Sequence, residues 1–339
     1  MKLSVETVDL ELKHTFTIAR GSEDVVTSVI TTIEHEGLRG YGEASPNSYY
    51  SQTPETVTEA LREVAPIIEG SRPGAYPELL RQLRDRLDGN RAALCAADLA
   101  LHDVLGKRRG KPIYKMLGVE SPRAPLSSFT IGISSIDHMR EKVREARKFP
   151  ILKIKLGTDR DLDIVRAIRE ETNATLRIDA NCGWDVGQTI TMSRELAELG
   201  VEFIEQPLPA ERLEEMEEVY RESALPVFAD ENSVTVDDIP SLVGRFHGIN
   251  IKLVKCGGIA EAMKMVEVAR THDLQIMLGC MIESSAGISA AAHVAPLVDA
   301  VDLDGAILIT NDPFRGVENQ YGQLVFPNRP GLGLEPARS

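Results

Sequence analysis

Five charged side chains end successive apolar runs in the second half of the chain. They follow one another at intervals of 24 to 26 residues, and in order they are Lys155, Asp179, Glu205, Asp230 and Lys255. In a barrel of parallel strands, residues at the carboxyl ends of the strands point toward one common mouth. The spacing therefore predicts a ring of charges at that mouth, with three carboxylates between two lysines.

Three carboxylates that converge repel one another unless a cation lies between them. Oxygen ligands with positions left open for water and substrate are typical of Mg²⁺ sites. We therefore expect Asp179, Glu205 and Asp230 to bind Mg²⁺. A single charge at a strand end is more often a solvated loop residue, but five at one regular period are not well explained in that way.

The elements that would position this ring are repeated couplets of an apolar run and an amphipathic stretch. Alternating strands and helices favour a parallel sheet, and eight units within about 190 residues favour a closed barrel. The fold class is therefore α/β, a (β/α)-barrel with an N-terminal α+β domain. The expected strands are 125–131, 151–156, 176–178, 201–204, 226–228, 249–253, 275–278 and 300–303.

The first 120 residues are predicted to form the smaller α+β domain. Residues 1–43 alternate as in a three-stranded meander, and Thr53-Pro54-Glu55 is typical of a helix start. Between the first two strands lies His14 to Asp24, which we expect to be a loop long enough to act as a lid. The barrel is expected over 121–310, and residues 311–339, which have lost the periodicity, are expected to pack back on the first domain.

The composition excludes several other classes of protein. With 52 acidic and 38 basic residues the formal net charge is −14, which argues against a nucleic-acid partner. No apolar run approaches the length of a membrane span, and Met1 to Leu12 lacks the apolar block of a signal peptide, so a cytoplasmic location is expected. The four cysteines form no metal-binding or disulfide pattern.

The charged motifs, in order and at barrel spacing, resemble the enolase superfamily and within it the muconate-lactonizing subgroup. The motifs that carry the resemblance are Lys153-Ile-Lys155, Asp179-Ala-Asn181, Glu205-Gln-Pro207, Asp230-Glu231 and Lys255-Cys-Gly-Gly258. The resemblance spans the whole chain, including Gly40-Tyr-Gly-Glu-Ala44. It implies a modified (β/α)₇β barrel with a capping domain and Mg²⁺ bound by Asp179, Glu205 and Asp230.

The sequence looks most like the dipeptide epimerases of that subgroup, because Asp302-Leu-Asp304 matches their DxD motif for the α-ammonium of a dipeptide. The reaction implied is removal of the proton α to the carboxylate, giving an enediolate, and its return on the opposite face. The resemblance implies Lys155 and Lys255 as the acid/base pair and Lys153 as the residue that tunes them. Lys252 is a competing choice for the second lysine.

Further residues are expected around the substrate. Asn181 and Glu231 would orient the metal ligands, and Thr130 matches a position that contacts substrate in the family. Met281 and Glu283 would line the pocket, although a structural hydrogen-bonding role for Glu283 is an equal alternative.

The identity of the second residue of the dipeptide is less defined. Arg20, in the predicted lid, suits a side-chain carboxylate and hence L-Ala-D/L-Glu, but it is also explained as an exposed lid charge. Relatives in the family also epimerise hydrophobic and cationic dipeptides, and enolase-type barrels often assemble, so a homo-oligomer is possible.

Two alternatives remain open. One is an o-succinylbenzoate synthase or muconate cycloisomerase of the same superfamily, whose substrates have no ammonium group for Asp302 and Asp304 to bind. The other is a metal-independent barrel enzyme that uses Lys255 to form a Schiff base.

Overall fold

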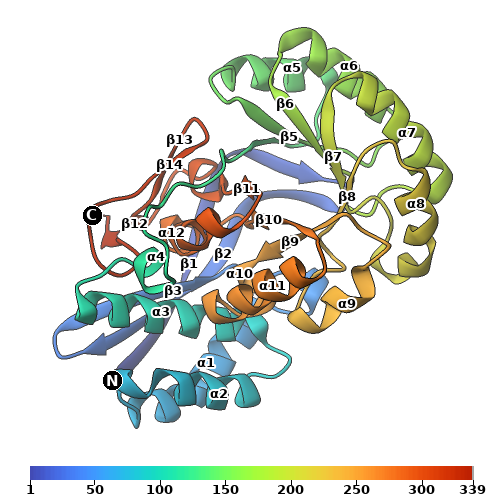
Figure 1. The fold of residues 1–339 in the computed structure, drawn as a ribbon. Helices are drawn as coiled ribbons and strands as arrows, with labels where there is room; N and C mark the ends of the chain where they lie inside the picture. Colours follow the sequence, from blue (N-terminus) through green and yellow to red (C-terminus); the bar gives the residue numbers. More distant parts are fainter. Residues whose placement is uncertain (338–339) are drawn as a thin grey trace.

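The couplets after residue 125 fold into eight parallel strands with helices between them. A computed structural model of the chain describes residues 1–337 (Figure 1). The barrel strands are β4 (Phe129–Ile131), β5 (Ile151–Lys155), β6 (Thr175–Asp179), β7 (Val201–Glu205), β8 (Val227–Ala229), β9 (Gly248–Lys252), β10 (Gln275–Gly279) and β11 (Ala300–Asp302). Each of the eight expected strands is therefore confirmed.

The sheet closes on itself. Its strands are ordered from β4 to β11 as they follow in the chain, and the backbone just before β4 joins β11, where Ser127 pairs with Val301 and Ser128 N donates to Val301 O at 3.1 Å. Parallel register places the strand ends side by side, because Lys155 is paired with Asp179 and Asp179 with Glu205. The expected ring of strand ends is thus built into the hydrogen-bonding register.

The helices between the strands cover the outside of the barrel (Figure 1). They are α5 (Ile136–Glu145), α6 (Asp161–Glu171), α7 (Val186–Glu198), α8 (Met216–Glu222), α9 (Ile239–Leu242), α11 (Ile259–Thr271) and α12 (Ser285–Val294), with the short α10 (Leu253–Cys256) directly after β9. Seven strand–helix pairs followed by a final strand confirm the (β/α)₇β architecture expected from the sequence.

The N-terminal part forms a cap made of an antiparallel sheet and helices. Its elements are β1 (Lys2–Ile18), β2 (Gly21–His35), β3 (Leu38–Ala44), α1 (Pro54–Glu69), α2 (Tyr76–Arg86), α3 (Arg91–Arg109) and α4 (Ile113–Met116). Thr53 caps α1 as expected, since its side chain accepts a hydrogen bond from Thr56 N. Gly40 and Gly42 let β3 lie directly on α3, because a Cβ at either position would come within 2.2 Å of a helix carbonyl oxygen.

The segment from His14 to Asp24 differs from its prediction as a loop. Residues Phe16–Ile18 continue β1 and pair with Gly21–Glu23 of β2, after an irregularity that follows Glu11. Thr15 Oγ1 donates a hydrogen bond to Asp24 Oδ1, and the hydroxyl groups of Thr17 and Ser22 share another. Because these cross-strand contacts are polar, the segment lacks the apolar alternation by which a strand is recognised in a sequence. The segment is therefore the far end of a β-hairpin, and in Figure 1 the blue β1–β2 ribbon extends from the cap to the barrel.

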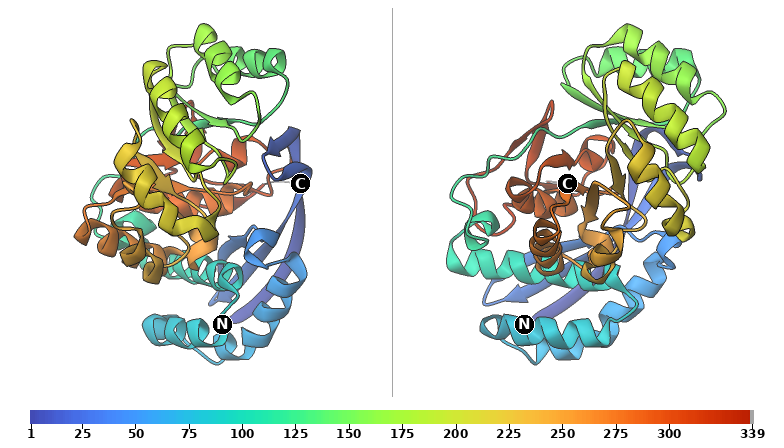
Figure 2. Two further views of the ribbon diagram at one scale, coloured as in Figure 1. Left: turned by 90° about the vertical axis from the view of Figure 1, so that its right-hand side faces the viewer. Right: turned by 45° about the vertical axis from the view of Figure 1, so that its right-hand side comes forward.

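The C-terminal segment contains the short strands β12 (Phe314–Arg315), β13 (Glu318–Gln320), β14 (Gln323–Val325) and β15 (Glu335–Pro336). It contacts the cap at several points: the ring of Phe314 lies 5.0 Å from that of Tyr41, and Leu332 N donates to Asp103 Oδ1 at 2.8 Å. The exact domain boundaries at residues 120 and 310 stay a prediction. The last two residues of the C-terminal segment, 338 and 339, lie outside the described part of the chain. Figure 2 shows the cap below the barrel in two further views.

Within residues 1–337, no helix combines the length and the apolar character that crossing a membrane requires.

Candidate active site

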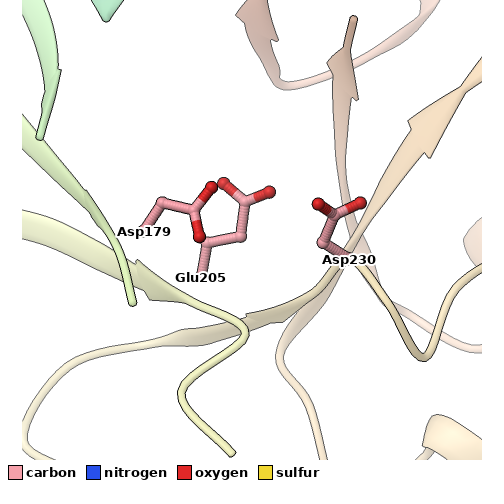
Figure 3. A group of neighbouring side chains, drawn as sticks. All are labelled: Asp179, Glu205 and Asp230. Carbon is pink, nitrogen blue, oxygen red and sulfur yellow. The ribbon is translucent and has the colours of Figure 1, made fainter. Parts of the chain in front are cut away.

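Three carboxylates meet at the mouth of the barrel. Asp179 and Glu205 end β6 and β7, and Asp230 directly follows β8. Each offers an oxygen within 4.8 Å of the oxygens of the other two, and all three side chains are buried. Figure 3 shows the carboxylates pointing toward one another from separate strands. The structure thus brings together the three residues expected to bind a metal.

The surroundings of this triad fit a divalent cation. Burial and the neighbouring Asp179 raise the pKa of Glu205 to about 7, which shows that the negative charge is incompletely balanced there. Asn181 Oδ1 is buried and has no hydrogen-bond partner among the described residues, and Glu205 Oε2 has the Lys153 ammonium at 2.7 Å as its ion-pair partner. Converging carboxylate oxygens are the donor set that Mg²⁺ prefers.

Lys153 lies at the centre of the cluster, where it joins the triad to the end of β11. Its Nζ is 3.2 Å from Asp179 Oδ2, 2.7 Å from Glu205 Oε2 and 2.8 Å from Asp302 Oδ2. Burial alone would lower the pKa of Lys153, but the carboxylates around it outweigh burial and hold the pKa well above its usual value. Lys153 is therefore a fixed positive charge in this arrangement.

Two further lysines flank the triad from different sides. Lys155 Nζ, on β5, lies 2.6 Å from Asp179 Oδ2, and Lys252 Nζ, at the end of β9, lies 2.8 Å from Asp230 Oδ2. Burial opposes the shift, but Lys155 and Lys153 lower the pKa of Asp179 to about 2. Both Lys155 and Lys252 line the main cavity at the mouth.

Lys255 does not lie where the sequence predicts a catalytic lysine. Its Nζ is fixed by Asp230 Oδ1 at 2.5 Å, by Asp230 O at 2.6 Å and by Asn250 O at 3.1 Å, and its side chain is fully buried. It lines an adjoining cavity of about 150 Å³ and not the cavity that Lys155 and Lys252 line. The reason is local: β9 ends at Lys252 and the chain turns into α10, so Lys255 points into the wall behind Asp230.

The two aspartates of the DxD motif lie beside the triad, from which Lys153 separates Asp302. Asp302 Oδ1 accepts a hydrogen bond from Ser128 Oγ at 2.6 Å, and Asp304 Oδ2 accepts one from Thr130 N at 2.6 Å. Burial, followed by the proximity of Asp302, raises the pKa of Asp304 to about 7. Two buried carboxylates of this kind form a site where a cation relieves repulsion.

The cavity that joins these groups has a volume of about 770 Å³. Predicted residues that line it are Arg20, Thr130, Lys153, Lys155, Asn181, Asp230, Glu231, Met281, Asp302 and Asp304. Asp179 and Glu205 are fully buried beneath its surface. A site that holds a carboxylate triad and, on the other side of Lys153, a pair of aspartates suits a short ligand with a carboxylate and an ammonium group.

Glu283 does not line this cavity. Its Oε1 accepts a hydrogen bond from Met281 N at 3.0 Å, and burial together with the nearby Glu43 raises its pKa to about 8. Glu43 comes from the cap and accepts hydrogen bonds from Ser284 N and Gly287 N at the start of α12. These contacts support the structural alternative for Glu283 rather than substrate binding.

The cap contributes much of the cavity wall, including Arg20, Tyr49 and Tyr50, of which the sequence singled out Arg20. Arg20 comes from the turn of the β1–β2 hairpin, and its Nη2 lies 2.7 Å from Glu231 Oε1. Tyr49 and Tyr50 come from a short 3₁₀ turn, Ser48–Tyr50, which has no periodicity that could have revealed them. The sequence therefore did not predict that Tyr50 lines the cavity, which only the fold reveals.

The chain matches two family descriptions over most of its length. Residues 2–118 match the description "Mandelate racemase / muconate lactonizing enzyme, N-terminal domain", and residues 137–339 match "Enolase C-terminal domain-like".

Three similar proteins illustrate the relationship. A curated relative named L-Ala-D/L-amino acid epimerase, from Flavobacterium johnsoniae, is 43% identical over 98% of this chain and 99% of its own. The substrate-liganded L-Ala-D/L-Glu epimerase from Bacillus subtilis has a TM-score of 0.94 at 28% identity, covering both chains completely. The dipeptide epimerase from Enterococcus faecalis, complexed with Mg and L-Leu-L-Tyr, has a TM-score of 0.93 at 33% identity over 98% of each chain.

Matches to both domains, a barrel of the expected topology and full-length relatives above 40% identity agree with one another. This chain belongs to the mandelate racemase/muconate lactonizing enzyme family of the enolase superfamily.

Proposed function

We propose that the protein is a Mg²⁺-dependent dipeptide epimerase, an isomerase that inverts the α-carbon of the second residue of a dipeptide. The observation that carries the proposal is one cavity that brings together a buried carboxylate triad, the pair Asp302 and Asp304, and the lysines Lys155 and Lys252 on either side of the triad. Relatives and structural neighbours named as dipeptide epimerases support it.

The triad and the aspartate pair would together fix the orientation of the substrate. Asp302 and Asp304 receive the α-ammonium through charge-assisted hydrogen bonds. Asp179, Glu205 and Asp230 hold Mg²⁺, which would stabilise the negative charge that develops on the substrate carboxylate when the α-proton leaves. Lys153, which lies between the triad and Asp302, holds a positive charge beside that carboxylate.

Lys155 and Lys252 then face the α-carbon from two sides. One neutral lysine removes the proton and the other, as an ammonium, returns a proton on the opposite face, which inverts the centre. Lys255 has no access to the cavity, so its role is to fix Asp230 through the contacts described above. The assignment therefore replaces Lys255 with Lys252, the competing choice that the sequence left open.

The remaining roles follow from contacts. Asn181 N donates to Asp179 Oδ1 at 2.9 Å, so the chain after β6 orients that ligand. Thr130 N anchors Asp304, and Met281 forms part of the wall. Glu231 neighbours Asp230 and pairs with Arg20.

The lyase and cycloisomerase alternative is less compatible with this cavity. Asp302 and Asp304 are both buried and line it, and Lys153 pairs with Asp302 alone, so a substrate without an ammonium group would leave Asp304 without a cationic partner. The Schiff-base alternative requires a free neutral Lys255, but that side chain already donates to three oxygens and does not line the main cavity.

The test is to incubate the purified protein with L-Ala-L-Xaa dipeptides and Mg²⁺ and to separate the diastereomers by chromatography. We expect L-Ala-D-Xaa to accumulate to equilibrium, and we expect a chelator to stop the reaction and added Mg²⁺ to restore it. A product other than the L-Ala-D-Xaa diastereomer, or a rate of epimerisation that a chelator leaves unchanged, would contradict the proposal.

A location in the cytoplasm and assembly of copies into a homo-oligomer stay predictions. Cell fractionation and the mass of the protein in solution would test them.

A further inference from the structure

The turn of the β1–β2 hairpin docks on the barrel through a fitted contact. Ile133 N donates to Thr17 O at 2.8 Å, and Ala19 rests on Gly157, where a Cβ would come within 2.8 Å of Ala19 Cβ. This docking places Arg20, the next residue of the turn, over the loops that follow β6 and β8.

The guanidinium of Arg20 is already occupied in that position. Its Nη2 pairs with Glu231 Oε1 at 2.7 Å, its Nη1 donates to Asn181 O at 3.2 Å, and its Cζ lies 4.8 Å from the centre of the Tyr49 ring. Arg20 keeps 34% of its side chain exposed, whereas Glu231 keeps 1%. The positive charge at the edge of the cavity is thus paired with a carboxylate buried behind it.

Arg20 lies at the end of the cavity where the second residue of a dipeptide binds. It contacts the residues after Asp179 and Asp230, which belong to the triad that receives the substrate carboxylate. The ammonium end, at Asp302 and Asp304, lies on β11 and beyond. The side chain next to the carboxylate is therefore the part of the substrate that meets Arg20.

We propose that Glu231 masks Arg20, so that the cavity favours dipeptides whose second residue has an uncharged side chain over those with an acidic one. This inference rests on the proposed function and names its substrate class. An acidic side chain that took Arg20 would leave Glu231 as a buried carboxylate with no partner, since Glu231 Oε2 has no hydrogen bond to any described residue. Ile18, Tyr49 and Tyr50, which also line the cavity, offer no alternative cation.

The experiment compares L-Ala-L-Glu with L-Ala-L-Gln, which have nearly the same shape and differ in charge. The measured quantity is the ratio of kcat/KM for the Glu dipeptide to that for the Gln dipeptide, taken within each protein. In the wild type we expect a ratio of 1 or below. In Glu231→Gln, which unmasks Arg20, we expect the ratio to rise at least tenfold.

Two further variants provide the controls. Arg20→Gln leaves Glu231 unpaired and should lower the ratio, and the double variant Arg20→Gln/Glu231→Gln should return it to near the wild-type value. Because the ratio is internal to each protein, a general loss of activity or stability does not change its meaning. If Glu231→Gln loses all turnover, the shift in melting temperature produced by each dipeptide gives the same comparison through binding.

Failure of the inference and failure of the proposed function give different results. A wild-type ratio of ten or more, or a ratio that Glu231→Gln leaves unchanged, overturns the masking role while epimerisation stands. If the wild type epimerises neither these dipeptides nor any other L-Ala-L-Xaa, the proposed function itself is wrong.

Discussion

At the scale of single residues, the site depends on which lysine tips reach the cavity. Lys252 and Lys255 are three residues apart and both contact Asp230, yet only Lys252 lines the cavity with Lys155. A side chain at a strand end faces the mouth, whereas one in the following helical turn faces the wall. We therefore propose Lys155 and Lys252 as the acid/base pair.

Replacing either of these lysines by methionine should separate the two halves of the reaction. We expect Lys155→Met and Lys252→Met each to lose about 10²- to 10⁴-fold in epimerisation rate, the usual contribution of a general acid or base. Each variant should still exchange the α-proton of one diastereomer with solvent deuterium, and the two variants should act on opposite diastereomers.

The exchange is measured by proton NMR in deuterated water, with Lys264→Met, a half-exposed lysine of α11 outside the site, as the matched control. Exchange of the same diastereomer by both variants would contradict two-sided proton transfer.

The aspartates of β11 make a separate prediction about the ammonium group. Asp302→Asn and Asp304→Asn should each raise KM for a dipeptide by about ten- to a hundredfold, because a hydrogen bond to a charged group contributes about 1.5–3 kcal/mol. An N-acetylated dipeptide, which has no ammonium group, should be a poor substrate for the wild type. In the variants, the ratio of kcat/KM for the acetylated dipeptide to that for the free dipeptide should rise. Steady-state kinetics with both substrates checks this, and an unchanged preference would favour the lyase alternative.

At the scale of elements, the hairpin end and the barrel loops form one surface of the cavity. Gly157 has φ +112° and its missing side chain makes room for Ala19, so the hairpin turn needs glycine there. Backbone hydrogen bonding and this close contact hold Arg20 in place, although the two segments are far apart in the chain.

Gly157→Ala should push the hairpin turn away from the barrel. We expect KM for dipeptides to rise about tenfold, which corresponds to about 1.4 kcal/mol, with a smaller change in kcat. Gly187→Ala is the matched control, because an added Cβ in α7 would have its nearest neighbour at 3.6 Å and alanine favours a helix. If both variants keep the wild-type KM, the hairpin does not shape the substrate site.

Residues at regular strand ends could be predicted from the sequence, and residues that depend on where an element turns could not. The triad followed from the period of one strand–helix unit, and Thr53 from the chemistry of a helix cap. Strand β9 ends at Lys252, three residues before Lys255, and the strand–helix period alone does not show which of these two lysines is at the strand end. The pair of Arg20 with Glu231 joins residues 211 positions apart, and no local pattern records such a contact.

At the scale of the whole molecule, the cap and the barrel are joined by a buried interface. Glu43 of β3 accepts hydrogen bonds from the first turn of α12, and Ser45 Oγ donates to Ile282 O at 2.9 Å, beside the cavity. Since Arg20, Tyr49 and Tyr50 come from the cap, neither part alone completes the cavity. The net charge of −14 says little about this site, because we propose that its carboxylates bind a metal and an ammonium group.

Glu283, which lies near Glu43 at this interface, leads to a prediction about how the stability of the protein depends on pH. Burial and the nearby Glu43 raise the pKa of Glu283 to about 8 in the folded protein, above the usual value of 4.5, so the folded state keeps a proton that the unfolded state releases. Its contribution to stability is complete below pH 4.5 and is lost as the pH rises through 8. Glu283→Gln imitates the protonated form, so its melting temperature relative to the wild type should increase from pH 5 to pH 8. A difference that stays constant over this range would contradict the buried, protonated Glu283.

The most direct test of the whole account is the mass of a dipeptide after incubation with the protein and Mg²⁺ in deuterated water. Proton exchange at the α-carbon of the second residue predicts a gain of one deuterium at that position, together with appearance of the L-Ala-D-Xaa diastereomer, and predicts neither when a chelator is present. Inverted product without deuterium, deuterium at another carbon, or incorporation that persists without metal would contradict metal-assisted proton transfer by Lys155 and Lys252.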